Sequence, residues 1–204
     1  TVEENVPVTI SDLAAGDYSL EVTDQNGCTQ TVTVTITEPT ALVIDLADIQ
    51  NVNCNGENNG SLFLTASGGT PGDPGYILNY FGDDLPIAGG VPVSISDLAP
   101  AEYTFDVTDE NGCLISETIE ITEPDPLTLE ITEFMDNDGS MNGSITVGAS
   151  GGTEPYQYSI DGGITFQDEP VFEGLEGGEF FIIVEDANGC EADVSQTITG
   201  LNDI

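Results

Sequence analysis

The sequence predicts an all-β protein built of tandem Ig-like antiparallel β-sandwich modules joined end to end. Three observations support this prediction. Sequence blocks recur at offsets of 77 to 85 residues, apolar residues alternate with polar ones inside the blocks, and 24 glycines and 11 prolines provide many turns. A repeat of this length exceeds a solenoid unit, so we expect each repeat to fold as a domain of its own.

The repeats are clearest around a segment that ends in cysteine. Tyr18–Cys28 recurs as Tyr103–Cys113 at an offset of 85 residues and as Phe180–Cys190 at a further 77. A second block, Asn59–Thr70, recurs as Asn142–Thr153 at an offset of 83. The two blocks alternate along the chain. A module therefore has a front half with Asn-Gly-Ser and Gly-Gly-Thr, and a back half with Asn-Gly-Cys.

Module boundaries are predicted at two Thr-Glu-Pro motifs, Thr37–Pro39 and Thr122–Pro124. Proline cannot donate a ladder hydrogen bond, so it ends one strand and stiffens the joint. The chain divides into the back half of a module (1–39), a complete module (40–124) and a second complete module (125–204). The half module cannot bury a core alone, and its front strands would come either from upstream chain or from a neighbouring subunit.

Within a module the apolar residues follow a period of two. Tyr103, Phe105 and Val107 alternate with polar residues, which is typical of a half-buried antiparallel strand. The Asp-x-Asn-Gly sequence that follows predicts a hairpin turn, because Asn and Gly tolerate positive φ. Roughly seven short strands in each module, with no convincing helix, indicate the Ig-like sandwich.

The charge of the chain excludes several functions. There are 38 acidic residues and no Lys, Arg or His, so the formal net charge is -38. Without cations the chain cannot neutralise a phosphate backbone, which excludes nucleic-acid binding. It also lacks an imidazole for general-base catalysis and an amine for a Schiff base, so we expect no enzyme. No apolar run reaches the roughly 20 residues of a membrane span, so no membrane insertion is expected.

The four cysteines predict an oxidising compartment. Cys54 and Cys113 both lie in the first complete module, and we expect them to form a disulfide. Such a bridge indicates a protein that is extracellular or periplasmic, and we expect one that is displayed on the cell surface or secreted. The position that matches Cys54 in the second complete module falls at Asn137, which leaves Cys190 without a partner there. Cys28 lacks a front half, so these two cysteines are either buried free thiols or bonded to a neighbouring chain or to a missing segment.

Two candidate ligand sites compete with structural roles. Asp136 and Asp138 lie in an Asp-Asn-Asp-Gly-Ser sequence that resembles a calcium loop, although Val147 at the twelfth position excludes an EF-hand. The alternative is a polar turn between strands; no cofactor is required, and Ca²⁺ is the one candidate. Four tyrosines could stack on a surface glycan, but packing in the core is their favoured use: Tyr76, Tyr80, Tyr156 and Tyr158.

The ordered motifs resemble the SprB-type repeat, which is found in very large surface adhesins of gliding Bacteroidota. The resemblance rests on Ser150–Tyr158 (Ser-Gly-Gly-Thr-Glu-Pro-Tyr-Gln-Tyr), followed by Gly174–Phe180 and Asp186–Cys190. Two departures are that Thr70–Tyr76 stands where the family has Pro-Tyr-x-Tyr, and that the last module lacks the first cysteine. The resemblance implies a surface-displayed filament exported by the type IX pathway and implies no catalytic residue.

We therefore expect a non-enzymatic structural or adhesive extracellular filament or stalk, as part of a longer surface protein or fibre. Its partners would be other copies of itself or adjacent repeats of the same chain. The alternative is an adhesin module that binds calcium or surface glycans through the loop tips of the sandwich, with the repeats supplying avidity.

Overall fold

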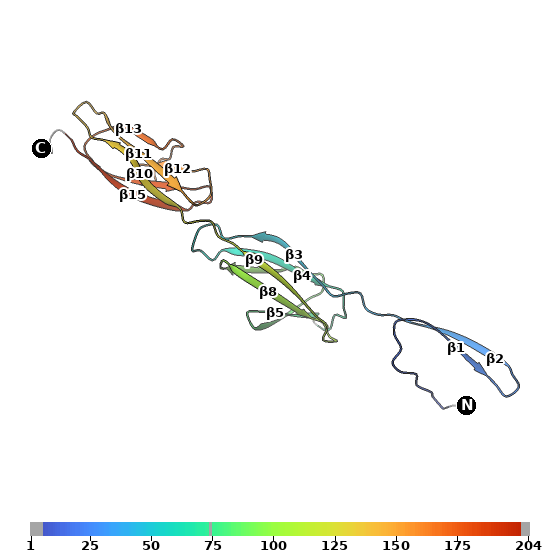
Figure 1. Cartoon of the computed structure of the whole chain (residues 1–204). Coiled ribbons are helices and arrows are strands. Elements are labelled where there is room, and N and C mark those ends of the chain that lie inside the picture. The colour runs from blue at the N-terminus through green and yellow to red at the C-terminus, as the bar shows by residue number, and fades with distance from the viewer. Residues whose placement is uncertain (1–5, 74, 201–204) are drawn as a thin grey trace.

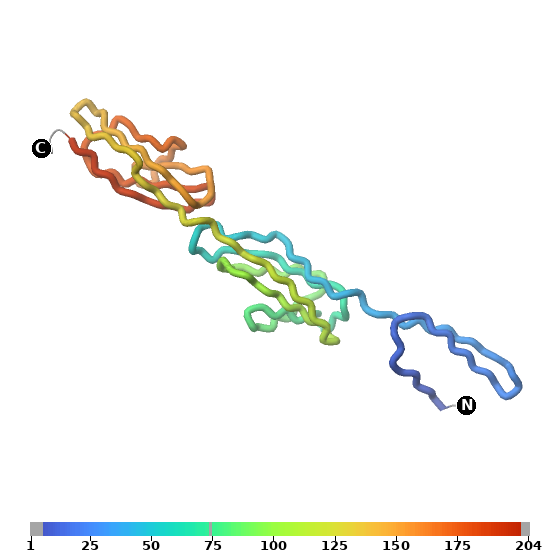
Figure 2. Tube along the Cα trace, in the orientation of Figure 1, coloured from blue at the N-terminus to red at the C-terminus, as the bar shows by residue number. Residues whose placement is uncertain are grey.

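The structure is a computed structural model that describes residues 6–73 and 75–200, and every regular element in these residues is a β-strand. The strands form three groups that follow one another in an extended row, with the N-terminal hairpin at one end (Figure 1, Figure 2). The prediction of all-β sandwiches arranged end to end is confirmed. The outermost residues of the predicted modules, 1–5 and 201–204, lie outside the described residues.

The middle group is a sandwich of two antiparallel sheets. One sheet has the strand order β3-β4-β7, and the other has the order β6-β5-β8-β9. This division of sequential strands between two facing sheets is typical of Ig-like domains. The strands are β3 (Val43–Gln50), β4 (Gly60–Ser67), β5 (Tyr76–Tyr80), β6 (Asp83–Ile87), β7 (Val93–Leu98), β8 (Ala101–Thr108) and β9 (Leu114–Ile121).

Alternating residues of the two sheets form the core of this sandwich. Strand β8 contributes Tyr103, Phe105 and Val107, none of which is more than 6% exposed, as the period of two predicts. Strand β4 contributes Leu62 and Leu64 to the same cluster from the opposite sheet. Burial of each such side chain stabilises the fold by roughly 1.5–3 kcal/mol, so the two sheets hold each other.

The last group repeats this plan with shorter edge strands. Its sheets have the orders β10-β11-β13 and β12-β14-β15, and an isolated bridge from Tyr158 to Gln167 pairs on the other edge of β12. A separate core contains Ile145, Ile182 and Val184. The strands are β10 (Thr128–Met135), β11 (Gly143–Ser150), β12 (Gln157–Ser159), β13 (Val171–Leu175), β14 (Gly178–Glu185) and β15 (Glu191–Ile198).

The N-terminal group is a single hairpin of β1 (Gly16–Thr23) and β2 (Thr29–Ile36). It corresponds to the β8-β9 hairpin of the middle group, but no second sheet covers its apolar face in the described residues. Val22 is therefore 59% exposed, whereas the aligned Val107 is fully buried. The back-half strands of a module are formed here, and the face that should carry a core is open.

Local geometry persists in this hairpin even without a core. Residues 6–15 form no strand, yet Asp12 has a φ of 60°, close to the 59° of the aligned Asp97. The hydroxyl of Ser11 donates to Asp12 at 2.9 Å, and that of Ser96 donates to Asp97 at 2.8 Å. The corner at Asp12 therefore has the same local conformation as the one at Asp97, although no facing sheet covers the hairpin in the described residues.

Two tyrosines fix the corner that leads into the back-half hairpin. The hydroxyl of Tyr103 donates to the carbonyl of Ala99 at 2.9 Å, and that of Tyr18 donates to the carbonyl of Ala14 at 2.8 Å. This contact is the tyrosine corner of Ig-like domains, in which the ring packs in the core while the hydroxyl holds the crossover. Phe180 occupies the aligned position of the last group and has no hydroxyl to donate.

We predict that Tyr103→Phe lowers the free energy of unfolding of the middle sandwich by about 1 kcal/mol. The ring stays packed, but the carbonyl of Ala99 loses its hydrogen bond. Urea unfolding followed by circular dichroism measures the change. Tyr80→Phe is the matched control, because among the described residues the hydroxyl of Tyr80 has no hydrogen-bond partner. Equal losses in the two variants would contradict the prediction.

Candidate functional site

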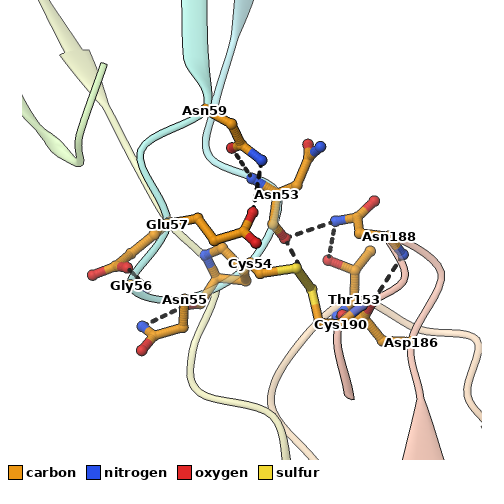
Figure 3. The surroundings of a disulfide bond; sticks show 12 residues. Asn53, Cys54, Asn55, Gly56, Glu57, Asn59, Thr153, Asp186, Asn188 and Cys190 are labelled. Carbon is orange, nitrogen blue, oxygen red and sulfur yellow. Dashed lines mark hydrogen bonds between the residues drawn. A yellow bond between two sulfur atoms is a disulfide. The ribbon is translucent and has the colours of Figure 1, made fainter. Parts of the chain in front are cut away.

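A disulfide joins the middle sandwich to the last one. Cys54 and Cys190 are bonded at an Sγ–Sγ distance of 2.05 Å, with 5.7 Å between their Cα atoms and a separation of 136 positions in sequence. Cys54 lies in the loop between β3 and β4, and Cys190 ends the turn between β14 and β15 (Figure 3). We call the loop 51–57, the turn 186–190 and the linker 122–127 the bridged joint.

The predicted disulfide between Cys54 and Cys113 is wrong, as is the expectation that Cys190 lacks a partner in this chain. Cys113 precedes β9, whereas the loop of Cys54 is bonded to the residue that follows β9 through the Val52 N–H and the Thr122 carbonyl, at 2.9 Å. At roughly 3.3 Å per residue, this eight-residue strand spans about 26 Å. A disulfide requires Cα atoms within about 7 Å, so opposite ends of one sandwich cannot be bridged.

The other two cysteines are free thiols. Both Cys28 and Cys113 are exposed, and each ends the turn between the two strands of a back-half hairpin. For Cys28 the two expectations were a buried thiol or a bond to a neighbouring chain or to a missing segment. The thiol is exposed rather than buried, and the bond to a neighbour stays a prediction.

Hydrogen bonds fasten the loop of Cys54 to the boundary motif of its own module. Besides the bond from Val52, the N–H of Gly56 donates to Oε2 of Glu123 at 2.6 Å. Within the loop, the N–H of Asn53 donates to Oδ1 of Asn59 at 2.9 Å. The Thr-Glu-Pro motif thus does more than end a strand, because it holds the loop that carries the cysteine at the end of the sandwich.

A buried aspartate organises the turn that carries Cys190. Asp186 is only 4% exposed. Its Oδ1 accepts the N–H groups of Asn188 and Cys190, each at 2.9 Å, and its Oδ2 accepts the N–H of Thr153 at 2.8 Å. Because the chain contains no cation side chain, backbone N–H groups are the donors that compensate for burial of this carboxylate.

Asp109 plays the same part in the middle sandwich. It accepts the N–H of Thr70 at 2.9 Å, that of Asn111 at 3.0 Å and that of Cys113 at 2.8 Å. These backbone bonds, that of Thr70 first, hold the pKa of Asp109 below its usual value. The cysteine turn and the Gly-Gly-Thr loop of a module are therefore fastened to each other through one carboxylate.

Direct contact across the bridged joint is sparse. The side-chain amide of Asn188 donates to the carbonyl of Asn53 at 3.1 Å and to Oγ1 of Thr153 at 3.1 Å (Figure 3). The sulfur of Cys190 lies 3.5 Å from the same carbonyl, and as a bridge sulfur it has no proton to donate. Clefts of about 420 and 380 Å³ are lined by residues of both modules. The disulfide is therefore the strongest restraint on this joint apart from the backbone linker itself.

The two aspartates of the candidate calcium loop hold backbone groups. Oδ1 of Asp136 accepts the N–H of Thr199 at 2.8 Å, and Oδ1 of Asp138 accepts the N–H of Ser140 at 3.1 Å. Across residues 6–73 and 75–200, no group of three or more His, Cys, Asp or Glu residues is placed to hold a metal ion. The geometry is that of a polar turn, and calcium binding here stays a prediction.

The same loop corrects one detail of the predicted alignment. Val52 and Asn137 each donate their N–H to the threonine that follows the last strand of their sandwich, at 2.9 and 3.1 Å. The position that matches Cys54 is therefore Gly139 rather than Asn137. The loop between β10 and β11 is shorter than the loop of Cys54, and it presents no cysteine.

The loop after β12 is held by a carboxylate that accepts several hydrogen bonds. Asp161 accepts Oγ1–H and N–H of Thr165 at 2.6 and 2.9 Å, the hydroxyl of Ser159 at 2.8 Å and the N–H of Ile164 at 3.0 Å. The bonds from Thr165, followed by that from Ser159, lower the pKa of Asp161 to about 2. This carboxylate is engaged within its own loop.

Core packing is confirmed for two of the four candidate glycan-stacking tyrosines. Tyr76 is 3% exposed and Tyr158 is 7% exposed, so their rings are not available to a sugar. Tyr80 is half-buried and lies against Phe105, with ring centroids 6.0 Å apart. The hydroxyl of Tyr156 donates to the carbonyl of Gly151 at 2.7 Å.

The family model of the SprB repeat matches residues 46–76 and 138–165, which lie in the front halves of the two complete modules. The predicted resemblance to the SprB repeat is confirmed. SprB repeats occur in extracellular surface proteins, and the first matched segment contains Cys54 and the whole of its loop 51–57. No curated protein matches the chain. Among the described residues, no helix is long and apolar enough to cross a membrane.

Two solved structures are similar to the chain. The fibronectin(III)-like modules of Clostridium thermocellum CbhA share 16% identity at a TM-score of 0.37, over 78% of this chain and 94% of theirs. A C-terminal 282-residue fragment of intimin, in complex with the intimin-binding domain of the translocated intimin receptor, shares 13% identity at a TM-score of 0.37. That match covers 76% of this chain and 65% of the fragment.

Sequence reasoning missed the residues that build the bridged joint, above all Asn53, Glu123 and Asn188. The direction of the last strand of a module is the signal in the sequence that could have placed the cysteine turn. The last strand of a module runs from the Asn-Gly-Cys turn to the Thr-Glu-Pro motif, so the turn must lie at the upstream end. The arrangement is a covalent cross-link between two modules, made by Cys54 and Cys190.

We predict that Cys190→Ser exposes Cys54 to alkylation, whereas Cys113→Ser leaves Cys54 protected, because Cys54 is bonded to Cys190. Alkylation of the unfolded, unreduced chain followed by mass spectrometry of peptides from a Glu-specific protease identifies the free thiol. Cys28→Ser provides a second control that should not alter Cys54. Alkylation of Cys54 in the Cys113→Ser variant would contradict the prediction, because it would show that Cys54 pairs with Cys113 of the same module.

We predict that Asp161 titrates with a midpoint of about 2 in the folded protein, below its ordinary value of 3.8. A lowered pKa in the fold means that its contribution to stability is complete above pH 4 and is lost as the pH falls through about 2. The difference in melting temperature between the wild type and Asp161→Asn should therefore shrink over that interval. Asp168→Asn controls for the change in charge, and an NMR titration midpoint near 3.8 would refute the prediction.

Proposed function

We propose that the chain is a segment of a non-enzymatic, extracellular structural filament or stalk built of tandem sandwich modules. The bridged joint carries this proposal, because it links consecutive modules both through the backbone and through the bond between Cys54 and Cys190. A single tether lets two domains swivel about it, whereas two separated attachments restrain both bending and twisting. Such a joint suits a protein that must stay extended.

The linker of the joint supports the same role. Pro124 and Pro126 limit its backbone freedom. The carbonyl of Asp125 accepts the N–H of Gly152 from the downstream sandwich at 2.8 Å, while Thr122 accepts the N–H of Val52 on the upstream side. The linker is thus hydrogen-bonded to both modules, and it acts as part of the joint rather than as a loose tether.

The charge supports an extended and separated fibre. All 38 ionisable acid side chains are unopposed by any cation side chain, so neighbouring modules and neighbouring fibres repel each other. Salt screens this repulsion beyond a Debye length of roughly 8–10 Å at physiological ionic strength. The disulfide keeps the joined ends together against the repulsion, and the acidic surface keeps the fibres from bundling.

The disulfide also supports the proposed location. Disulfides persist in oxidising compartments and are rare in the cytosol, and SprB repeats occur in extracellular surface proteins. We therefore propose a secreted or surface-displayed fibre. Adhesion through loop tips that bind calcium or surface glycans is the alternative role, and the experiment that follows distinguishes it.

Electron microscopy of the native material tests this function. We expect thin fibres with a beaded axial repeat, each bead longer than the roughly 26 Å of an eight-residue strand. Treatment with a reductant should leave the beads intact and make the path between them less straight, because the backbone linker remains. Dispersed monomers that bind calcium or a glycan would overturn the structural role in favour of the adhesin module.

A further inference from the structure

The two joints of the chain attach the downstream module in the same way. In the bridged joint the N–H of Gly152 donates to the carbonyl of Asp125 at 2.8 Å, and in the joint upstream that of Gly69 donates to the carbonyl of Thr40 at 2.8 Å. The φ angles of the two glycines are 59° and 57°. A Cβ at either position would come within 2.6 or 2.7 Å of the turn aspartate. The first joint therefore has the architecture of the second on its downstream side.

The turn that receives the disulfide is also duplicated. Asp186 accepts its three backbone N–H groups at 2.8, 2.9 and 2.9 Å, and Asp109 accepts the aligned three at 2.9, 3.0 and 2.8 Å. The carboxylates thus hold Cys190 and Cys113 in the same local geometry. The sulfurs differ, because that of Cys190 is bonded while that of Cys113 is a free, exposed thiol.

The upstream side of the first joint has the same Thr-Glu-Pro motif that holds the cysteine loop in the bridged joint. In the bridged joint the Thr122–Pro124 motif holds the cysteine loop, with the N–H of Gly56 donating to Glu123 at 2.6 Å. The Thr37–Pro39 motif places Glu38 at the aligned position, directly after the N-terminal hairpin. The apolar face of that hairpin is open, as expected for a back half that awaits its front strands.

We propose that Cys113 forms a second joint disulfide with a cysteine in the loop that matches Asn53–Gly56 of the front half completing the N-terminal hairpin. The inference does not rest on Cys113 alone, because Cys190 forms this bond from the same turn in the same chain. The rule is directional: the loop of each module donates its cysteine to the turn of the next. The partner thiol comes from chain preceding the hairpin or from a neighbouring copy.

The bond forms by thiol–disulfide exchange. The thiolate of one cysteine attacks a sulfur of an oxidised dithiol or oxidised glutathione and releases the other sulfur of that reagent as a thiolate. The second protein thiolate then attacks the mixed disulfide and releases the remaining reagent sulfur. Two protein thiols lose two protons and two electrons, and the reagent disulfide is reduced to two thiols. Exposure of Cys113 leaves it accessible to either step.

A tandem duplication within the full chain tests the proposal. The variant has residues 1–124 followed by residues 40–204, so that the complete module precedes a second copy of itself. After oxidation with glutathione, we expect Cys54 of the first copy to bond with Cys113 of the second copy, and Cys54 of the second copy to bond with Cys190. Cys28 and Cys113 of the first copy should remain free. Peptide mapping of the alkylated, unreduced chain identifies which cysteines are paired, and serine variants of one copy at a time assign each Cys54–Cys113 pair to its copies, because the two copies give identical peptides.

Matched serine variants decide the outcome. Cys113→Ser in the second copy should free Cys54 of the first copy, whereas Cys113→Ser in the first copy should change no bridge. The bridge to Cys190 reports that the variant has folded. A free second-copy Cys113 beside an intact bridge to Cys190 overturns the proposal, as does a bond between Cys54 and Cys113 of one copy.

Native material distinguishes the two sources of the partner. Mapping should find Cys113 linked to a cysteine outside residues 1–204. On a denaturing gel, reduction should leave the mass unchanged when the partner belongs to the same chain, and should lower it to that of one chain when the partner belongs to a neighbour. A free Cys113 thiol in native fibres overturns the proposal.

Discussion

The buried carboxylate of the cysteine turn is the interaction on which the arrangement of modules depends. In a chain with no Lys, Arg or His, Asp109 and Asp186 have no side-chain cation to pair with, and backbone N–H groups satisfy them instead. These donors come from two segments, the turn itself and the Gly-Gly-Thr loop of the front half. One side chain therefore fixes the turn, fastens the two halves of a module and presents a cysteine to the joint. Electrostatic compensation in this protein is local and made by the main chain, which leaves the exposed acids to act as a uniformly repulsive coat.

The joint also gives the array a direction. A module contributes two unlike surfaces, a loop held by its Thr-Glu-Pro motif at the downstream end and an aspartate-organised turn at the upstream end. Because these surfaces differ, the contact is heterologous and passes from one module to the next without closing on itself. The last sandwich keeps the turn but has Gly139 where the loop cysteine would stand. Its turn is bonded to the preceding module through Cys190, but its loop has no cysteine at that position to bond with a following module.

Features that depend on neighbours in sequence were predictable, and features that depend on which end of a sandwich a residue occupies were not. The period of two placed Tyr103 and Val107 in the core, and the corner around Asp12 keeps its conformation without any second sheet. The pairing of Cys54 required knowledge of strand direction over the whole module, and the assumption that disulfides stay within a domain led to Cys113. The candidate calcium loop shows the same limit, because its acids were recognised by type, while the partner of Asp136, the N–H of Thr199, lies more than sixty residues away.

The disulfide has a mechanical consequence. A pull applied to the two ends of this chain runs along the backbone to residue 54, crosses between the sulfurs to residue 190 and continues to the end. The intervening residues, which include most of both sandwiches, are taken off the load path. The bridge spans 136 residues, which corresponds to roughly 450–490 Å of extended chain at about 3.3–3.6 Å per residue. That length of chain cannot be extended by force while the bridge is intact. One disulfide therefore limits the mechanical unfolding of both modules.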